Sequence, residues 1–285
     1  MAGFGATLNR MRDGVEARSA GFSFRTKLTA VYAVIAVLSI LLFMAFQFDI
    51  AFMRLWLPFI IRGVPLTLFI CFGAIILATI LALLGALGRL SDSALFQGVA
   101  NFYVSFIRGT PLIVQIYFIY FALPQLAFKP SSPAFLEPLL VYNIVVAAIL
   151  ALGINYGAYM TEIFRAGIQS VSGGQVEAAH ALGMNGWQTM RRIVLPQAVR
   201  VIIPPTGNEF IAMLKDSALV GLAGGAAELF NRAESVGISQ TRPFETLTIA
   251  ALVYWGLTSI FSFFQKRLET RIARGHVRDL AAHGH

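Results

Sequence analysis

Six apolar stretches, each long enough to cross a lipid bilayer, constrain the fold of this chain more than any other feature. They cover residues 28–48, 61–88, 102–127, 139–160, 198–225 and 244–265. A helix needs about 20 apolar residues to span the hydrocarbon core, and it satisfies its own backbone hydrogen bonds there. Only 13% of the residues are charged, about half the share in a soluble domain. The sequence therefore predicts an all-α membrane protein with six transmembrane helices.

The basic residues predict how the chain is oriented. Residues 1–27 form a polar, basic leader, and residues 269–285 form a basic tail after the last stretch. Basic residues concentrate in the cytoplasmic segments of membrane proteins. We therefore assign the net charge of +8 to orientation rather than to nucleic acid binding. Six spans place both termini on one side, and we expect that side to be the cytoplasm, because it then receives most of the 22 basic residues.

One long polar segment, residues 166–197, interrupts the apolar pattern between the fourth and fifth stretches. It is too polar to enter lipid, so it lies in water or against another protein. The sequence predicts a turn at Gly173 and Gly174 and then a short helix over 175–182. Gly183 follows the end of this helix, where φ is positive, and Asn185 caps a second helix with a capping-box pattern. A structured polar loop in a membrane protein favours a part that is driven by a partner.

The fifth stretch is the least apolar of the six. Pro204 and Pro205 predict a broken helix, which lipid tolerates only beside protein or a wet cavity. Glu209 and Asp216 lie seven residues apart and therefore share one face. A charge at this depth is costly, so it faces a pathway or a partner. Two alternatives stay open: Asp216 satisfies Lys215, and Glu209 pairs with another helix or is buried as a neutral acid.

Polar residues of three stretches are the candidates for a substrate cavity: Asn208, Glu209, Gln115 and Tyr156. Tyr156 lies between Gly153 and Gly157, whose small size predicts close packing of helices. For the polar side chains of this fourth stretch, hydrogen bonds between helices are an equal alternative to contact with a ligand. Arg108 opens the polar entry to the third stretch, and snorkelling to the membrane boundary is its favoured interpretation.

The predicted spans lack histidine, and the chain lacks the common metalloprotease and nucleotide-binding motifs, so an enzyme is disfavoured. The four histidines all lie outside the six stretches: His180, His276, His283 and His285. The chain contains neither a His-Glu-x-x-His motif nor a phosphate-binding Gly-x4-Gly-Lys-Ser/Thr loop. Cys71 is the single cysteine, so no disulfide forms within the chain, and we expect it to be a small buried apolar residue. We therefore expect a protein that is not an enzyme and holds no catalytic residue, metal or cofactor.

The polar segment carries a family resemblance. Glu177, Ala178 and Ala179, followed by Gly183 and by Ile-Val-Leu-Pro at 193–196, resemble the EAA loop of bacterial ABC importer permeases. Six segments in the same order make the chain similar to permeases of the polar amino acid type: residues 63–68, 108–115, 157–165, 174–179, 195–200 and 214–217. The resemblance covers about residues 60–270.

This resemblance implies the permease subunit of a type I importer in the bacterial inner membrane, which moves a polar amino acid. The implied permease domain covers residues 58–268 and has a core of five helices, so the span at 28–48 is extra. We favour a packing or assembly role for that span. The implied partners are cytoplasmic ABC ATPase subunits, a periplasmic amino acid-binding protein, the lipid bilayer and a second permease chain, either identical or related. The EAA loop would dock on the ATPase through four residues: Glu177, Ala178, Ala179 and Gly183.

One alternative from another class of protein stays open, a membrane anchor or sensor subunit that recruits a soluble partner without transport. The charges in the fifth stretch favour transport, because a passive anchor has no need of them. These residues do not identify the amino acid, and they do not decide between a homodimer and a heterodimer of permeases.

Overall fold

The structure is a computed structural model that describes residues 23–45 and 48–282, and every regular element in this part of the chain is helical. The predicted all-α class is therefore confirmed. The chain divides into two compact units, Met1–Ala51 and Phe52–His285. In the first unit, helix α2 (Phe24–Ala45) contains most of the predicted extra span. Residues 1–22 of the predicted leader lie outside the described residues.

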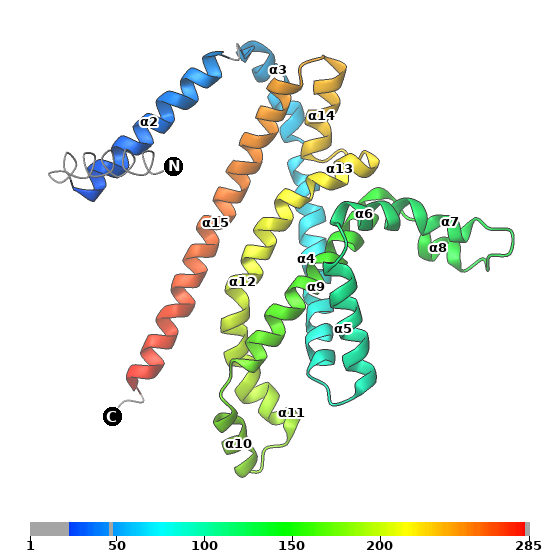
Figure 1. Cartoon of the computed structure of the whole chain (residues 1–285), viewed down its shortest axis with the longest axis vertical. Helices are drawn as coiled ribbons and strands as arrows, with labels where there is room; N and C mark the ends of the chain where they lie inside the picture. The colour runs from blue at the N-terminus through cyan, green and yellow to red at the C-terminus, as the bar shows by residue number, and fades with distance from the viewer. Residues whose placement is uncertain (1–22, 46–47, 283–285) are drawn as a thin grey trace, which may run out of the picture. The chain divides into compact units, whose positions relative to one another are not determined.

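A series of helices with short connections follows, in which α3 begins at the end of the first unit and the others lie in the second (Figure 1). Their bounds are α3 Ile50–Ile61, α4 Val64–Arg89, α5 Ala94–Arg108, α6 Leu112–Tyr117, the π-helix η1 Phe118–Ala122, α7 Pro124–Ala127, α8 Leu136–Leu140, α9 Ile144–Gln169, α10 Gly173–Ala181, α11 Gly186–Thr189, the π-helix η2 Met190–Val194, α12 Leu195–Asp216, α13 Ala218–Gly224, α14 Leu229–Ser239 and α15 Pro243–Ala282. The tail predicted at 269–285 thus continues α15 as helix as far as Ala282.

The described helices contain four that are long and apolar enough to cross a membrane, and a bent pair makes a possible fifth. The four are Phe24–Leu41, Ile50–Arg89, Ile144–Gln169 and Pro243–Ile272. The bent pair joins Ala94–Arg108 to Leu112–Ala127 at an angle of 107°. The segment predicted as one span over 102–127 is therefore not a single straight helix. The break falls before Pro111, since the residue preceding a proline is disfavoured in helical conformation.

The core of the second unit lies between α4 and α9. Alanines recur at every fourth position of α4 and are all buried: Ala74, Ala78, Ala82 and Ala86. On α9, Gly153 lies against Leu77 and Gly157 lies against Leu81, so closely that a side chain at either glycine would collide. The predicted close packing around these two glycines is confirmed, and small residues provide it here as they do in other membrane helices.

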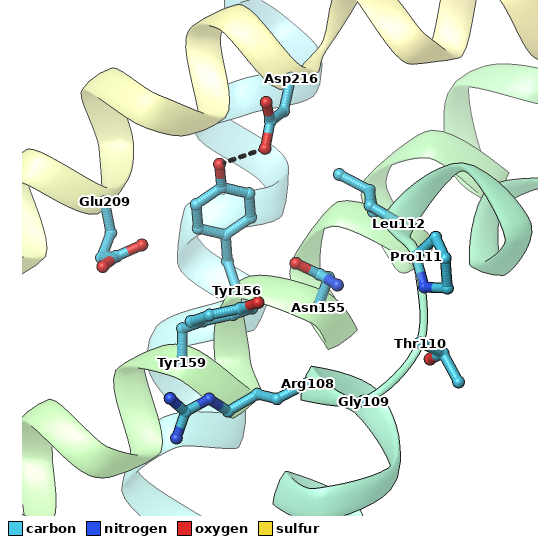
Figure 2. Close-up of a pocket in the computed structure, with 10 residues that line it drawn as sticks. All are labelled: Arg108, Gly109, Thr110, Pro111, Leu112, Asn155, Tyr156, Tyr159, Glu209 and Asp216. Carbon is cyan, nitrogen blue, oxygen red and sulfur yellow. Dashed lines mark hydrogen bonds between the residues drawn. The ribbon is translucent and has the colours of Figure 1, made fainter. Parts of the chain in front are cut away.

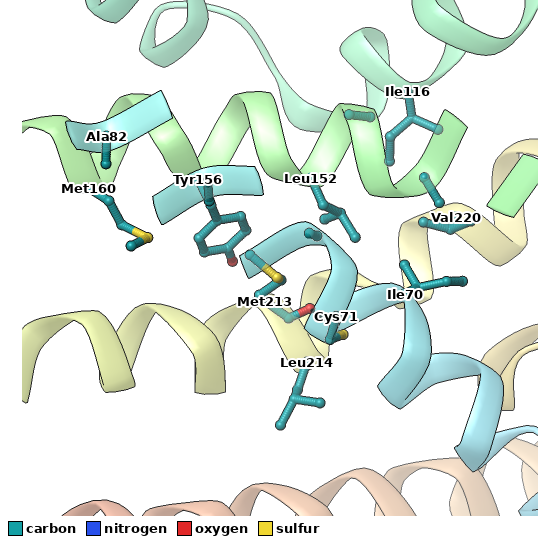
Figure 3. Close-up of a cluster of buried hydrophobic side chains, with 14 of the residues drawn as sticks. Ile70, Cys71, Ala82, Ile116, Leu152, Tyr156, Met160, Met213, Leu214 and Val220 are labelled. Atoms are coloured by element: carbon teal, nitrogen blue, oxygen red, sulfur yellow. Dashed lines mark hydrogen bonds between the residues drawn. The ribbon is translucent and has the colours of Figure 1, made fainter. Parts of the chain in front are cut away.

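Larger side chains from α4, α9, α12 and α13 complete this core (Figure 3). Leu152 and Met160 of α9 are fully buried, as are Met213 and Leu214 of α12. Cys71 of α4 is also fully buried, in agreement with its expected role as a small apolar residue. This packing fixes α12 against α4 and α9, and it thereby fixes the charged residues that α12 carries.

The prediction that α12 is broken at its prolines is wrong. The helix runs from Leu195 to Asp216 with Pro204 and Pro205 inside it. Neighbouring α15 packs closely at this point, since the side chain of Gln265 donates a hydrogen bond to the carbonyl oxygen of Pro204 at 2.6 Å. A side chain at Gly207 would collide with Gln265. The proline-containing segment is therefore helical where it packs against α15.

Candidate functional site: a charged cavity and a polar loop

A cavity of about 510 Å³ lies where the turn between α5 and α6 meets α9 and α12 (Figure 2). Its volume falls within the usual range of small-molecule sites, roughly 300–1,000 Å³. Ten residues line it: Arg108, Gly109, Thr110, Pro111, Leu112, Asn155, Tyr156, Tyr159, Glu209 and Asp216. Two of the four predicted substrate-binding residues, Glu209 and Tyr156, are among them.

The walls of this cavity carry charges of both signs. Glu209 and Asp216 of α12 both line it, as their spacing of seven residues predicted. The hydroxyl of Tyr156 donates a hydrogen bond to Oδ2 of Asp216 at 2.8 Å. Arg108, at the end of α5, lies with its guanidinium over the ring of Tyr159, 5.1 Å from the ring centre. A molecule with a cationic and an anionic group therefore finds a complement for each group here.

Gln115 lies behind the cavity wall and holds that wall in place. Its side chain is 8% exposed, and its amide nitrogen donates to the carbonyl oxygens of Ile107 and Thr110 at 2.8 and 3.1 Å. Its amide oxygen accepts a hydrogen bond from Asn155 of α9 at 3.0 Å. These contacts add hydrogen bonds to a carbonyl at the end of α5 and to one in the turn before Pro111. The structure thus places Gln115 as a support of the turn rather than as a lining residue.

Asn208 and Lys215 lie apart from the cavity. Both are exposed, and neither is a lining residue. Within the described chain, the structure records no ion pair between Lys215 and Asp216, and Asp216 instead accepts the hydrogen bond from Tyr156. The interpretation in which Lys215 satisfies Asp216 therefore has no support in the geometry. Hydrogen bonding between helices, left open for the fourth stretch, is present at both Asn155 and Tyr156.

Arg108 was not predicted at the cavity, because an arginine near a helix end more often reaches toward the membrane boundary. The structure gives it a carboxylate partner instead, since Nη1 of Arg108 lies 3.4 Å from Oε1 of Glu162 on α9. The signal available in the sequence was the turn itself. An arginine directly before a Gly-Thr-Pro break belongs to a segment whose backbone must face protein or water.

The polar segment forms two short helices at the ends of α9 and α12 (Figure 1). Gly183 has φ of +78°, as predicted. Its N–H donates to the carbonyl of His180, and the N–H of Met184 donates to that of Ala179, which together form a Schellman motif. The capping box at Asn185 is also present. The turn predicted at Gly173 and Gly174 is wrong, since both residues begin α10.

The four predicted docking residues differ in exposure. Glu177, Ala178 and Gly183 are exposed, whereas Ala179 is 3% exposed and packs within the chain. Two large apolar side chains of the loop are strongly exposed, Leu182 at 83% and Trp187 at 71%. Exposed large apolar side chains such as these are typical of a surface that contacts another protein.

These features together define a class of protein: a helical membrane protein with a charged, ligand-sized cavity between its helices and a structured polar loop at one end. The family described as "Binding-protein-dependent transport system inner membrane component" matches residues 74–274. The chain belongs to this family. The predicted resemblance to permeases of bacterial ABC importers is thereby confirmed.

Named relatives and a solved structure extend this similarity. "Arginine transport system permease protein ArgU" of Corynebacterium glutamicum is 41% identical over 212 residues, which are 73% of this chain and 66% of that protein. "Probable amino-acid permease protein YxeN" of Bacillus subtilis is 38% identical over 226 residues, or 79% and 96% of the two chains. The "Crystal structure of an amino acid ABC transporter with histidines" contains a chain 38% identical to this one, with a TM-score of 0.69 and coverage of 79% and 99%.

Proposed function

We propose that this chain is the transmembrane permease subunit of a type I ATP-driven importer, and that it moves a polar amino acid across the inner membrane. The observation that carries the proposal is the cavity in which Glu209 and Asp216 face the same space as Arg108. An amino acid carries one ammonium and one carboxylate group, so this set of charges is complementary to it. The names of the relatives point to the same class of substrate.

In this proposal the carboxylates of α12 receive the ammonium group and Arg108 receives the carboxylate. Tyr156 orients Asp216 through its hydrogen bond, and Gln115 keeps the wall of the cavity in place. Asn208 has no place in this cavity, and we do not retain it as a binding residue. The amino acid would arrive from a periplasmic binding protein, since family members of this description depend on one.

ATP hydrolysis belongs, in this proposal, to cytoplasmic ABC ATPase subunits that dock on the loop formed by α10 and α11. Glu177, Ala178 and Gly183 would contribute exposed contacts. Leu182 and Trp187 would add apolar side chains that can enter a pocket of the partner. Ala179 would contribute by allowing close packing within the loop, because its buried methyl group leaves no room for a larger side chain. A second permease chain, identical or related, would complete the pathway.

The experiment that tests the proposed cavity is uptake by Glu209→Gln in the assembled transporter. This change keeps the size of the side chain and removes its charge, so we expect uptake to fall at least tenfold, equivalent to about 1.4 kcal/mol. Assembly and basal ATP hydrolysis should stay intact. The matched control is Glu137→Gln, which changes an exposed acid on α8. Unchanged uptake by Glu209→Gln would assign Glu209 to structure, and loss of assembly would assign it to contacts between helices.

A further inference from the structure

A second cavity, of about 560 Å³, adjoins the first one. The two cavities share three lining residues, Arg108, Gly109 and Tyr159. The guanidinium of Arg108, which lies over the ring of Tyr159, therefore belongs to the wall between them (Figure 2). The other lining residues of the second cavity come from α4, α5 and α9: Arg89, Asn101, Val104, Ser105 and Glu162.

The second cavity has a surplus of positive charge. Three arginines share the one carboxylate of Glu162: Arg89 and Arg108 approach Oε1, and Arg165 approaches Oε2 at 3.0 Å. Arginine stays protonated in proteins. Arg165 does not line the cavity, so the lining carries two arginines, Arg89 and Arg108, against the one carboxylate of Glu162. The first cavity has the opposite balance, with two carboxylates and one arginine. An ammonium group is therefore favoured in the first cavity, and a carboxylate is favoured in the second.

The order of the cavities along α9 gives them a direction. Tyr156 lines the first cavity, Tyr159 lines both, and Glu162 lines the second. Three residues advance about 4.5 Å along a helix, so the second cavity lies closer to Gln169, the end of α9 that leads into the polar loop. In the proposed orientation this is the cytoplasmic side.

Arg108 is the arginine of this cluster that can leave Glu162 most easily. Its distance to the carboxylate is 3.4 Å, longer than that of Arg165, and Glu162 keeps two arginine partners when Arg108 departs. We propose that the second cavity is an inward binding site for the α-carboxylate of the transported amino acid, and that Arg108 passes this carboxylate from the first cavity to the second. The inference rests on the proposed function.

The test places a thiol in the second cavity. The native Cys71 is buried. The Ser105→Cys variant therefore has a single accessible cysteine in the permease chain. In inside-out membrane vesicles carrying the full transporter, each reagent's rate is divided by its rate with a free thiol in solution. On this scale the anionic reagent sulfonatoethyl methanethiosulfonate should modify Ser105→Cys at least fivefold faster than its cationic trimethylammonium counterpart. Adding Arg89→Gln should reduce this ratio severalfold. The control is Ser93→Cys, an exposed position in the polar turn before the same helix and outside the cavity, which should show no preference for the anionic reagent.

Protection by substrate then tests the role of the carboxylate. The probes are the L-amino acid with the highest uptake among the twenty and the amide of that amino acid, both added directly to the exposed cytoplasmic face. The amino acid should slow modification of Ser105→Cys by the anionic reagent at least threefold, and the amide should not. Equal protection by both compounds, or a preference for the cationic reagent, overturns the inference.

The proposed function fails by a different result, in which none of the twenty amino acids is taken up. If Ser105→Cys does not assemble, Asn101→Cys places the thiol on the same cavity one helical turn earlier. The same reagent preference is expected there, and its absence at that position overturns the inference as well.

Discussion

At the scale of single residues, Glu228 is a buried acid at the start of α14, outside the two cavities. It is fully buried, and its carboxylate caps α14 by accepting hydrogen bonds from the backbone N–H groups of Phe230 and Asn231 at 2.9 and 2.7 Å. The hydroxyls of Thr67 in α4 and Tyr254 in α15 donate to the same carboxylate at 3.2 and 3.0 Å. One buried acid thus joins three helices of the second unit.

We expect Glu228→Ala to destabilise the protein by about 3 kcal/mol, because it removes a helix cap and leaves several buried donors without an acceptor. The midpoint of thermal unfolding in detergent measures this effect. Glu137→Ala, which removes an exposed acid from α8, serves as the control. Equal midpoints for the two variants would contradict the structural role of Glu228.

Glu209 and Asp216 could be predicted from the sequence as functional acids, but the burial of Glu228 could not. The reason is the polarity of the segment in which each acid lies. The first two lie in an apolar segment, where any charge is costly and therefore conspicuous. Glu228 lies in a polar segment, where an acid usually faces water. Its partner Thr67 is 161 positions away in the sequence, so only the packing of α4 against α14 reveals that it is buried.

At the scale of elements, the turn between α5 and α6 is the part of the first cavity that depends most on a single side chain. We expect Gln115→Leu to loosen this turn, since two backbone carbonyls and Asn155 lose their partner, at a cost of about 1 kcal/mol for each hydrogen bond. Uptake should fall severalfold while the complex still assembles. Gln125→Leu, at an exposed position on α7, should transport normally. Equal uptake by both variants would show that the turn does not need Gln115.

The end of α10 supports a graded prediction at Gly183. An added side chain would meet no neighbour within 4 Å, so only the φ of +78° opposes substitution. Asn tolerates this conformation, Ala costs roughly 1–2 kcal/mol, and a β-branched residue costs more. We expect coupled ATP hydrolysis and uptake to decline in the order Gly183→Asn, Gly183→Ala, Gly183→Val, with membrane insertion unchanged in all three. Equal activity of the Asn and Val variants would contradict the role of backbone conformation here.

The elements whose form depends on neighbouring residues could be predicted from the sequence. The end of α10 at Gly183 and the capping box at Asn185 both follow from hydrogen bonds within a few residues. The continuity of α12 could not be predicted, because it involves α15, where Gln265 packs against the proline-containing segment. A break before Pro111 could be predicted from the proline, but the bend angle of 107° could not. The angle depends on how the two helices pack against α9.

At the scale of the whole molecule, the apolar stretches predicted the helical class, and the polar loop and the six ordered segments predicted the family. The count of six spans stays a prediction, since length and apolar character identify four or five among the described helices. The helix α12 falls outside the spans that length and apolar character identify among the described residues, because it carries the charges that line the cavity. The charges that place α12 at the cavity also lower its hydropathy, so a hydropathy count misses this helix. Function and topology are therefore best tested together.

The length of α9 and the position of the polar loop predict the orientation of the chain in the membrane. The helix α9 has 26 residues and is about 39 Å long, enough to cross a bilayer. If the loop of α10 and α11 contacts a cytoplasmic ATPase, then the segment of α7 and α8 at the other end of α9 faces the periplasm. The chain then returns through α12, and α15 brings it back to the cytoplasm. Alkaline phosphatase inserted after Ser132 should be active, and a green fluorescent reporter after His285 should fluoresce.

A third insertion point makes this test decisive. A fluorescent reporter after Met184, within the polar loop, should give the same signal as the reporter after His285, because both are expected in the cytoplasm. Active phosphatase at His285 together with fluorescence at Met184 would mean an odd number of crossings between the loop and the C-terminus, and it would exclude a return through both α12 and α15. Active phosphatase at Met184 would reverse the orientation altogether and would remove the physical basis for an ATPase contact at this loop.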